Sequence, residues 1–306
     1  MFFVVFVIFV FSFFRAEHGY TTGMTLLGDM SPAARKSVLA VSMLVVLLLI
    51  TGAAWLLSRT AGGPRPGEQW YLLEEGNVPI GWRVVARTED KDGPHGYDVI
   101  GRPRTEGRET LMHWSRWRLN ARAKQGVYFS FIPLGQGPEG QIVYQQTDIK
   151  YGAGRVIITQ TTPTPVGPRG LQRVVDVDAK YLPEGTLWPA IAEAAKKGEK
   201  AAHKMVQDDV MDLINVAMEP LEKQSLMVQG ASVSVTPVKV SLADDRGNAL
   251  GEALYFVADD GAIVRIQLAA EGLSQIYDRV DYAAITQRFP RAPSDRTRAL
   301  RQQDLP

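Results

Sequence analysis

Apolar and polar residues alternate with a period of two over most of the chain between residues 68 and 284. This period is typical of antiparallel strands that bury one face. In the segment IGWRVVART, Trp82 and Val84 fall on one face of the predicted strand, and Arg83 and Arg87 fall on the other. The same alternation occurs in VYFSFIP, RVIITQTT, LQRVVDVD, ASVSVTPVKVSL, EALYFVA, AIVRIQL and SQIYDRVDY.

Turn residues separate these segments and predict short connections between successive strands. Gly, Asn and Asp stand where a positive φ is needed in EEGNVPIG, EDKDGPHG, LADDRGNALG and VADDGAIV. The last of these predicts a tight hairpin. Strands joined in this way form an antiparallel meander.

The phase of the alternation changes at two places. In LMHWSRWRLN it changes between Ser115 and Arg116, and in SVSVTPVKVSL it changes at Pro237. A shift of one residue exchanges the faces of a strand unless a β-bulge absorbs it, and bulges increase the twist of a sheet. We therefore expect a strongly curved sheet.

One amphipathic helix is predicted between Thr186 and Gly198. Thr186 suits the N-cap, Pro189 falls in the first turn where its missing N–H is tolerated, and Trp188 and Ile191 share one face. That apolar face has to be buried, most simply in the concave side of the sheet. The chain is thus expected to be mainly β, with a curved antiparallel sheet, as a half-barrel or open barrel, and one helix packed in its concavity.

The segment Met211–Glu219 fits two patterns. Leu213, Ile214 and Ala217 match the spacing of a helix face, but Ile214, Val216 and Met218 also match a strand. Periodicity alone favours the helix.

Residues 38–57 predict a transmembrane signal anchor. They lie within 22 uncharged residues, 37–58, which is long enough to cross about 30 Å of hydrocarbon as a helix. Their Leu, Val and Ile side chains favour insertion by about −5 kcal/mol. The small residues that could resemble a signal-peptidase site are followed by Trp55-Leu56-Leu57, so we expect no cleavage. TAGGPRPG then indicates a linker over residues 58–67.

The N-terminal segment, residues 1–37, contains a second apolar run, FFVVFVIFVFSFF. Thirteen residues make a helix of only about 20 Å, too short to span a bilayer. The run is either an interfacial element or the product of a misassigned start, with Met24 or Met30 as the true first residue. A short N-terminal piece before one large C-terminal body favours a single-pass protein of the cytoplasmic membrane whose C-terminal domain is periplasmic.

Composition adds three restrictions. The net charge is +1 with 22% charged residues, which gives no strongly basic face for nucleic acid. The absence of cysteine excludes disulfides and a lipidated N-terminal cysteine. Residues 285–306 contain few apolar residues and several arginines, and predict a disordered tail after the β-rich domain of residues 68–284.

No arrangement of residues predicts catalysis, a cofactor or a metal site. The four histidines are scattered, and no G-x-S-x-G elbow is present. Adjacent aspartates occur at 208–209, 244–245 and 259–260; they could bind calcium or share acid and base roles, but Asp in such positions more often supports a turn. The RWRLNARAK run could meet an anionic surface, although a solvated strand face explains it as well.

Three stretches taken together suggest a family: the opening WYLLEEGNVPIGW, the mid-chain LPEGTLWP and the closing ALYFVADDGAIVRI. With them, residues 68–284 resemble uncharacterised bacterial envelope β-proteins that share the half-barrel of lipoprotein carriers and sigma-factor regulatory periplasmic proteins. The resemblance implies a curved sheet that holds a helix in its concave side, with a groove for lipid chains or a partner peptide. It also implies that Met211–Glu219 is a strand. The class has no catalytic motif, so the resemblance assigns no functional residue.

Two main functions follow as hypotheses. The first is a non-enzymatic, membrane-anchored envelope protein that binds an apolar ligand or a protein partner in a β-groove. Aromatic residues on the strand faces and the helix are the candidate groove residues: Trp82, Trp114, Trp117, Phe129 and Trp188. The second is an envelope hydrolase with carboxylates distant in sequence, which requires two acidic side chains in one cleft within about 5–10 Å. A scaffold subunit of a membrane complex is a third possibility.

Overall fold

Residues 63–301 are described by the computed structural model, apart from short gaps at 104–109, 121, 123–124, 137–141, 153, 165, 184, 208–210 and 271–272. The predicted membrane anchor at 38–57, the segment before it and residues 302–306 lie outside this part. Within it, none of the helices combines the length and the apolar character that crossing a bilayer requires.

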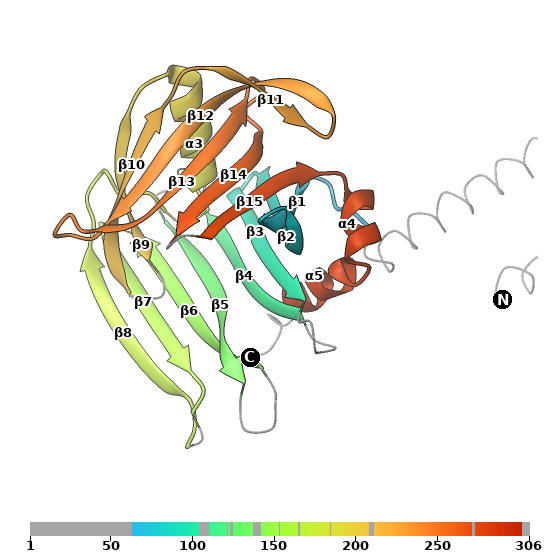
Figure 1. The fold of residues 1–306 in the computed structure, drawn as a ribbon. Coiled ribbons are helices and arrows are strands. Elements are labelled where there is room, and N and C mark those ends of the chain that lie inside the picture. The colour runs from blue at the N-terminus through green and yellow to red at the C-terminus, as the bar shows by residue number, and fades with distance from the viewer. Residues whose placement is uncertain are drawn as a thin grey trace, which may run out of the picture. The chain divides into compact units, whose positions relative to one another are not determined.

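The described part folds mainly as one large antiparallel sheet (Figure 1). Its strands are β1 (Glu68–Glu75), β2 (Val78–Asp90), β3 (Gly93–Pro103), β4 (Thr110–Leu119), β5 (Gly126–Gln136), β6 (Ile142–Gly152), β7 (Arg155–Thr162), β8 (Arg169–Asp176), β9 (Ala201–Gln207), β10 (Asp212–Pro220), β11 (Gln224–Val228), β12 (Ala231–Ala243), β13 (Ala249–Ala258), β14 (Ile263–Ala270) and β15 (Leu273–Val280). The helices are α3 (Leu187–Lys197), α4 (Tyr282–Arg288) and α5 (Ala292–Arg301).

The strand order shows two meanders joined at the centre of the sheet. It runs β8-β7-β6-β5-β4-β3-β2-β1-β15-β14-β13-β12-β10-β9, with β11 paired to β12. The first described strand, β1, therefore lies in the middle of the sheet, and the following strands lead to one edge at β8. The chain then crosses through α3 to the other edge at β9 and returns, so that β15 pairs with β1. Trp70 lies opposite Val280 in that closing pair.

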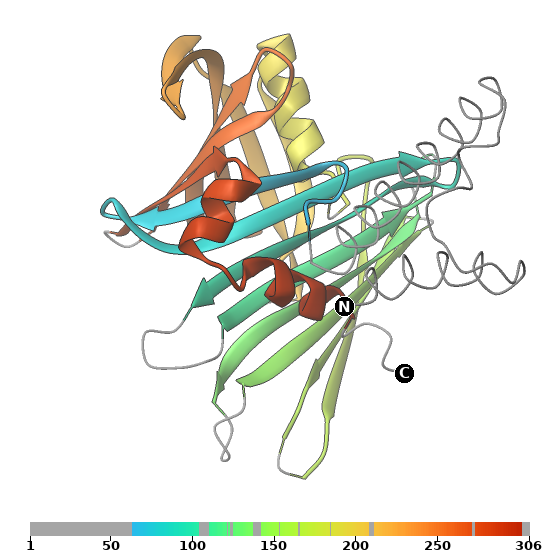
Figure 2. The same ribbon diagram turned by 90° about the vertical axis from the view of Figure 1, so that its right-hand side faces the viewer.

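The sheet curls so that its two edges approach each other. Val206 of β9 packs in the same buried cluster as Ile149 of β6 and Ile158 of β7. Arg173 of edge strand β8 forms an ion pair with Asp212 of β10, at 2.9 Å. Since β8 and β9 are not paired with each other in the described sheet, it stays open. Figures 1 and 2 show α3 beside β10, β12 and β13, the strands that it contacts.

The predicted helix and hairpin are both present. Helix α3 ends at Gly198, whose φ of 68° suits a left-handed C-cap. Thr186 does occupy the N-cap, but its hydroxyl donates to the carbonyl of Pro183 and caps no helical N–H. In the VADDGAIV turn, the Asp260 carboxylate accepts the backbone N–H of Ala262, so this aspartate supports the turn.

The strand that the resemblance implies for Met211–Glu219 is confirmed, and the helical spacing of this segment predicted the wrong structure. Asp212–Pro220 forms strand β10 between β9 and β12, and Met211 lies in the turn before it. Ile214, Val216 and Met218 are buried in the cluster under α3. The two flanking strands form hydrogen bonds with the backbone N–H and C=O groups of β10. This pairing overrides the local preference for a helix.

The two changes of alternation phase are not bulges. The register of β4 with both neighbours continues through Ser115 and Arg116, and that of β12 continues through Pro237. Instead, each strand buries opposite faces at its two ends: Val235 packs away from the cluster under α3, whereas Val238 packs within it. A strand that is buried on different faces along its length produces the same sequence pattern as a one-residue slip. The sheet's actual bulges lie elsewhere, for example between Leu73 and Glu74.

Residues 285–301 are largely helical, so the prediction of a disordered tail is wrong for this segment. Helices α4 and α5 occupy most of this segment and cover the face of β1, β3 and β4 (Figure 2). Their Ile285, Ala292 and Ala299 are buried against Trp70 and other large side chains of the sheet. Small and isolated apolar residues suffice here because large aromatic residues of the sheet, among them Trp70, Trp82 and Trp114, belong to the same buried cluster.

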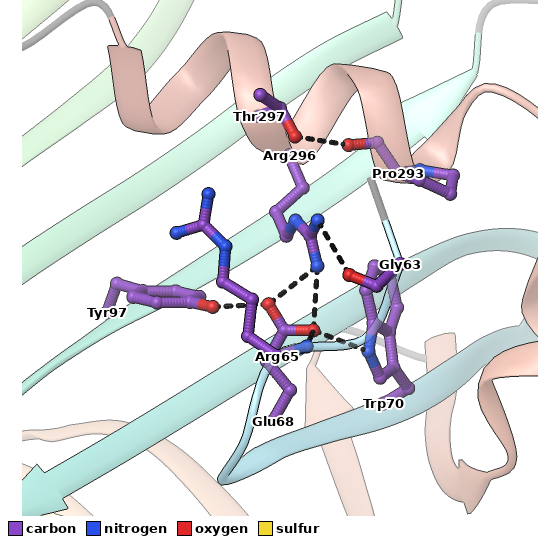
Figure 3. Close-up of polar contacts among 8 residues, drawn as sticks. All are labelled: Gly63, Arg65, Glu68, Trp70, Tyr97, Pro293, Arg296 and Thr297. Atoms are coloured by element: carbon purple, nitrogen blue, oxygen red, sulfur yellow. Dashed lines mark hydrogen bonds and ion pairs between the residues drawn. The ribbon is translucent and has the colours of Figure 1, made fainter. Parts of the chain in front are cut away.

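A buried ion pair also holds α5 in place (Figure 3). The Arg296 Nη1 atom lies 2.6 Å from Oε1 of Glu68, and the two side chains are 1% and 0% exposed. The Glu68 carboxylate also accepts hydrogen bonds from the Trp70 indole and the Tyr97 hydroxyl. Arg296 Nη2 donates to the carbonyl of Gly63, in the predicted linker. An arginine that suggested solvent exposure in the sequence is therefore among the most deeply buried residues.

Candidate functional site

A cavity of about 450 Å³ lies between α3 and the adjoining face of the sheet. Strands β1 to β5 provide its floor, and the start of α3 with the β13–β14 hairpin provides its opposite wall. The apolar lining includes Val85, Trp117, Leu187, Trp188, Met205 and Ile263. The polar lining includes Gln69, Arg83, Arg87, Asp98, Ser115 and Tyr128. Mostly apolar walls with a few polar groups are typical of small-molecule sites, and the volume lies in their usual range of about 300–1,000 Å³.

Strand register places the floor residues in cross-strand rows. Arg87 lies opposite Gly96, Gly96 opposite Trp117, and Trp117 opposite Tyr128. In the next row, Val85 lies opposite Asp98 and Asp98 opposite Ser115. Because side chains two residues apart share a face, both rows point into the same cavity.

Two glycines allow the Trp117 ring to lie against the floor. A Cβ added at Gly96 would be 2.5 Å from a ring carbon of Trp117, and one added at Gly185 would be 2.4 Å from the ring. Gly185 also has a φ of +84°, which an L side chain rarely adopts. Glycine at these two positions therefore determines how Trp117 lines the cavity.

Replacement of Gly185 with alanine is expected to destabilise the protein by about 1–3 kcal/mol more than replacement of Gly198 with alanine. Both glycines have a positive φ, but an added Cβ at Gly198 meets nothing within 4 Å. The difference between the two variants in urea unfolding thus measures the overlap with Trp117 alone. Equal stabilities would show that the ring moves aside without cost.

An arginine–aspartate pair lies at the base of the cavity. Arg83 Nε donates to Asp98 Oδ1 at 3.0 Å, and the guanidinium lies 5.0 Å from the ring centroid of Trp188 and 5.4 Å from that of Tyr277. Burial disfavours the charged guanidinium, but the charge and hydrogen bond of Asp98 outweigh this effect and raise the pKa of Arg83. Trp188 is further fixed by an edge contact with Tyr71, at 5.5 Å between ring centroids.

Arg87 differs from Arg83 in its surroundings. Burial lowers the pKa of the Arg87 guanidinium below its ordinary value, and the Glu89 carboxylate opposes this shift only in part. Within the described part of the chain, Arg87 has neither an ion pair nor a hydrogen bond from its guanidinium. Among the described residues, the cavity thus contains one neutralised cation, Arg83, and one cation without a counter-ion, Arg87.

The five candidate groove residues do not form one groove. Trp117 and Trp188 line the cavity. Trp82 and Trp114 are 0% and 1% exposed and pack on the opposite face of the sheet, under α4 and α5. Phe129 lies opposite Arg116 on that same outer face, because its neighbour Tyr128 points into the cavity. Aromatic density in the sequence does not show which of two buried faces a side chain occupies.

The polar residues of the cavity have only a weak signature in the sequence. Arg83 and Arg87 lie opposite the apolar face of their strand, a pattern typical of solvent exposure, whereas this face points toward α3. The only sequence signal was their spacing of four with Val85 between them, which puts all three on one face. No group of three His, Cys, Asp or Glu side chains in the described ranges is placed to hold a metal.

Comparisons with known proteins define the fold but no family. No family model and no curated protein matches the chain. The chain is similar to the crystal structure of a β-barrel-like protein of the domain of unknown function DUF1849 from Brucella abortus, with a TM-score of 0.50 and 11% identity over 70% of this chain and 95% of that one. A structure titled "putative lipoprotein" from Parabacteroides distasonis matches with a TM-score of 0.30 and 10% identity over 70% and 94%. The first similarity supports a β-barrel-like fold of this chain.

Proposed function

We propose that this chain is a non-enzymatic, membrane-anchored envelope protein that binds an apolar ligand in the cavity between α3 and the sheet. The observation that carries this proposal is the cavity of about 450 Å³ with Trp117 and Trp188 in its walls. Helix α3 packs on the sheet but leaves this space open, so the helix does not replace the ligand. A partner peptide of apolar side chains is the alternative occupant.

The charges of the cavity favour binding over hydrolysis. A carboxylate pair would need two acidic side chains in one cleft, and Asp98 is the one carboxylate among the described residues that line this cavity. Both carboxylate oxygens of Asp98 accept hydrogen bonds from Arg83 in an ion pair, so they are occupied. These contacts suit an orienting pair at the base of a site better than an acid or a base.

The proposed location rests on the sequence. Residues 38–57 have the length and composition of a membrane span, and we propose that they anchor the chain in the cytoplasmic membrane with the sheet on the periplasmic side. We expect the full chain to stay in the membrane fraction after an alkaline wash and to be digested by protease added to spheroplasts. Recovery in the soluble cytosol would contradict this location.

Native mass spectrometry of the full-length chain, purified gently in a non-ionic detergent, tests ligand binding. We expect an added mass of a single small apolar molecule, released by collisional activation and recovered in an organic extract. A bound peptide would identify the alternative occupant. A protein that carries no added mass, and that no acyl-chain photoprobe labels at the cavity, would contradict the proposal.

A further inference from the structure

The cavity described above has an uneven distribution of charge. Three charged side chains of the described part line it: Arg83, Asp98 and Arg87. Arg83 and Asp98 neutralise each other through an ion pair whose side chains are only 14% and 20% exposed. Arg87 remains as the cation that no described carboxylate pairs with, so the lining has an excess of one positive charge.

Arg87 lies near both solvent and the aromatic floor. Arg87 is exposed and therefore lies at the mouth of the cavity, whereas Arg83 on the same strand lies deeper. Across the strands, only Gly96 separates Arg87 from Trp117. Because glycine has no side chain, a ligand can contact Arg87 and Trp117 at the same time.

The Arg87 charge is also partly desolvated. Burial lowers the pKa of this guanidinium, which means that the surroundings disfavour its charge. A bound anion would compensate for the lost hydration, and a guanidinium offers the planar pair of N–H donors that carboxylates and phosphates accept. An uncharged ligand of the same length would leave the cation uncompensated.

We propose that the cavity selects single-chain amphiphiles with an anionic head group, a carboxylate or a phosphate monoester. The head group binds Arg87 at the mouth, and the acyl chain lies along Trp117 toward Trp188. This inference rests on the proposed function and adds the chemical class of its ligand.

Photolabelling of the full-length chain in a neutral, non-ionic detergent tests the inference. Three probes carry the same diazirine-bearing acyl chain: a fatty acid, a lysophosphatidic acid and an uncharged monoacylglycerol. We expect the two acids to label peptides that contain Trp117 or Trp188 about tenfold more than the monoacylglycerol, as one charge-assisted hydrogen bond implies. The ratio of the two acids identifies the preferred head group.

Substitution of Arg87 assigns the preference to this residue. We expect Arg87→Gln to lower labelling by the acids about tenfold relative to labelling by the monoacylglycerol, with Arg87→Lys in between. Arg116→Gln is the matched control, since Arg116 is exposed on the outer face of β4, two strands from β2, and does not line the cavity. The melting temperature of each variant verifies its fold.

The outcomes separate this inference from the proposed function. Equal labelling by acids and monoacylglycerol, or an Arg87→Gln variant that keeps the preference, would overturn the anionic selection while ligand binding stands. No labelling of the cavity by any of the three probes would overturn both.

Discussion

Replacement of Arg296 with methionine is expected to lower the free energy of unfolding by about 3–5 kcal/mol. The substitution leaves the Glu68 carboxylate buried without its cation, and removal of one partner of a buried ion pair is far costlier than removal of a surface charge. Since a domain has about 5–15 kcal/mol in total, much of the stability would be lost. Urea unfolding of the full-length chain in non-ionic detergent, followed by tryptophan fluorescence, measures the change.

An exposed ion pair of the sheet supplies the control. Arg155→Met removes a side chain that is 63% exposed and pairs at 3.0 Å with Asp176, which is itself 82% exposed, so we expect a change below about 1 kcal/mol. The double variant Glu68→Gln/Arg296→Met keeps a side-chain oxygen that accepts the hydrogen bond from Tyr97, and it removes the unpaired charge of the Glu68 carboxylate. It should therefore be more stable than the sum of the two single changes predicts. Similar stabilities of the Arg296 and Arg155 variants would contradict the role of the buried pair.

Filling of the cavity is expected to abolish ligand binding. Ala192 of α3 lines the cavity, and a tryptophan at this position would occupy the space beside Trp188. We expect Ala192→Trp to weaken binding at least about a hundredfold, which corresponds to about 2.7 kcal/mol, because ligand and side chain cannot share the volume. Native mass spectrometry and photolabelling of the variant would both report the loss.

Lys196→Trp adds the same bulk at an exposed position of the same helix and should bind ligand as the unmodified chain does. The comparison excludes a general effect of an extra tryptophan on α3. Melting temperatures of both variants identify a variant that loses binding only because it unfolds. An Ala192→Trp variant that folds and still binds would place the ligand outside this cavity.

The buried pair also connects segments that are far apart in the sequence. Arg296 of α5 contacts Glu68 at the start of β1 and Gly63 before it. The C-terminal helices thus hold the point where the predicted linker enters the sheet. Thr110 of β4 adds a second buried contact, since its hydroxyl donates to Asp295 at 2.6 Å.

Local patterns account for much of the secondary structure. Period-two alternation and Gly- or Asp-containing turns predicted strands such as β7 and β13–β15, because each depends on neighbouring residues alone. The amphipathic spacing of α3 is equally local. In contrast, β10 has a helical spacing and becomes a strand only because β9 and β12 lie on either side of it.

The candidate site could be predicted only in part. Trp117 and Trp188 were identified as candidates because large aromatic residues in a β-rich chain have to be buried or bind something. Trp82 satisfied the same criterion and lies under α4 and α5 instead. Which face of a strand meets α3 depends on packing between segments that are far apart in the sequence, and a period of two cannot distinguish two faces that are both buried.

By itself, the sequence determined that this chain has a β-rich body of alternating strands with one amphipathic helix, behind an apolar segment long enough to span a membrane. These properties follow from the spacing of residues along the chain. Only the tertiary structure decided that β1 lies at the centre of the sheet, that the C-terminal arginine Arg296 is buried against Glu68, and that Arg87 stands beside Trp117 at an open cavity. Each of these depends on contacts between distant segments, whose energies have no signature in the local pattern.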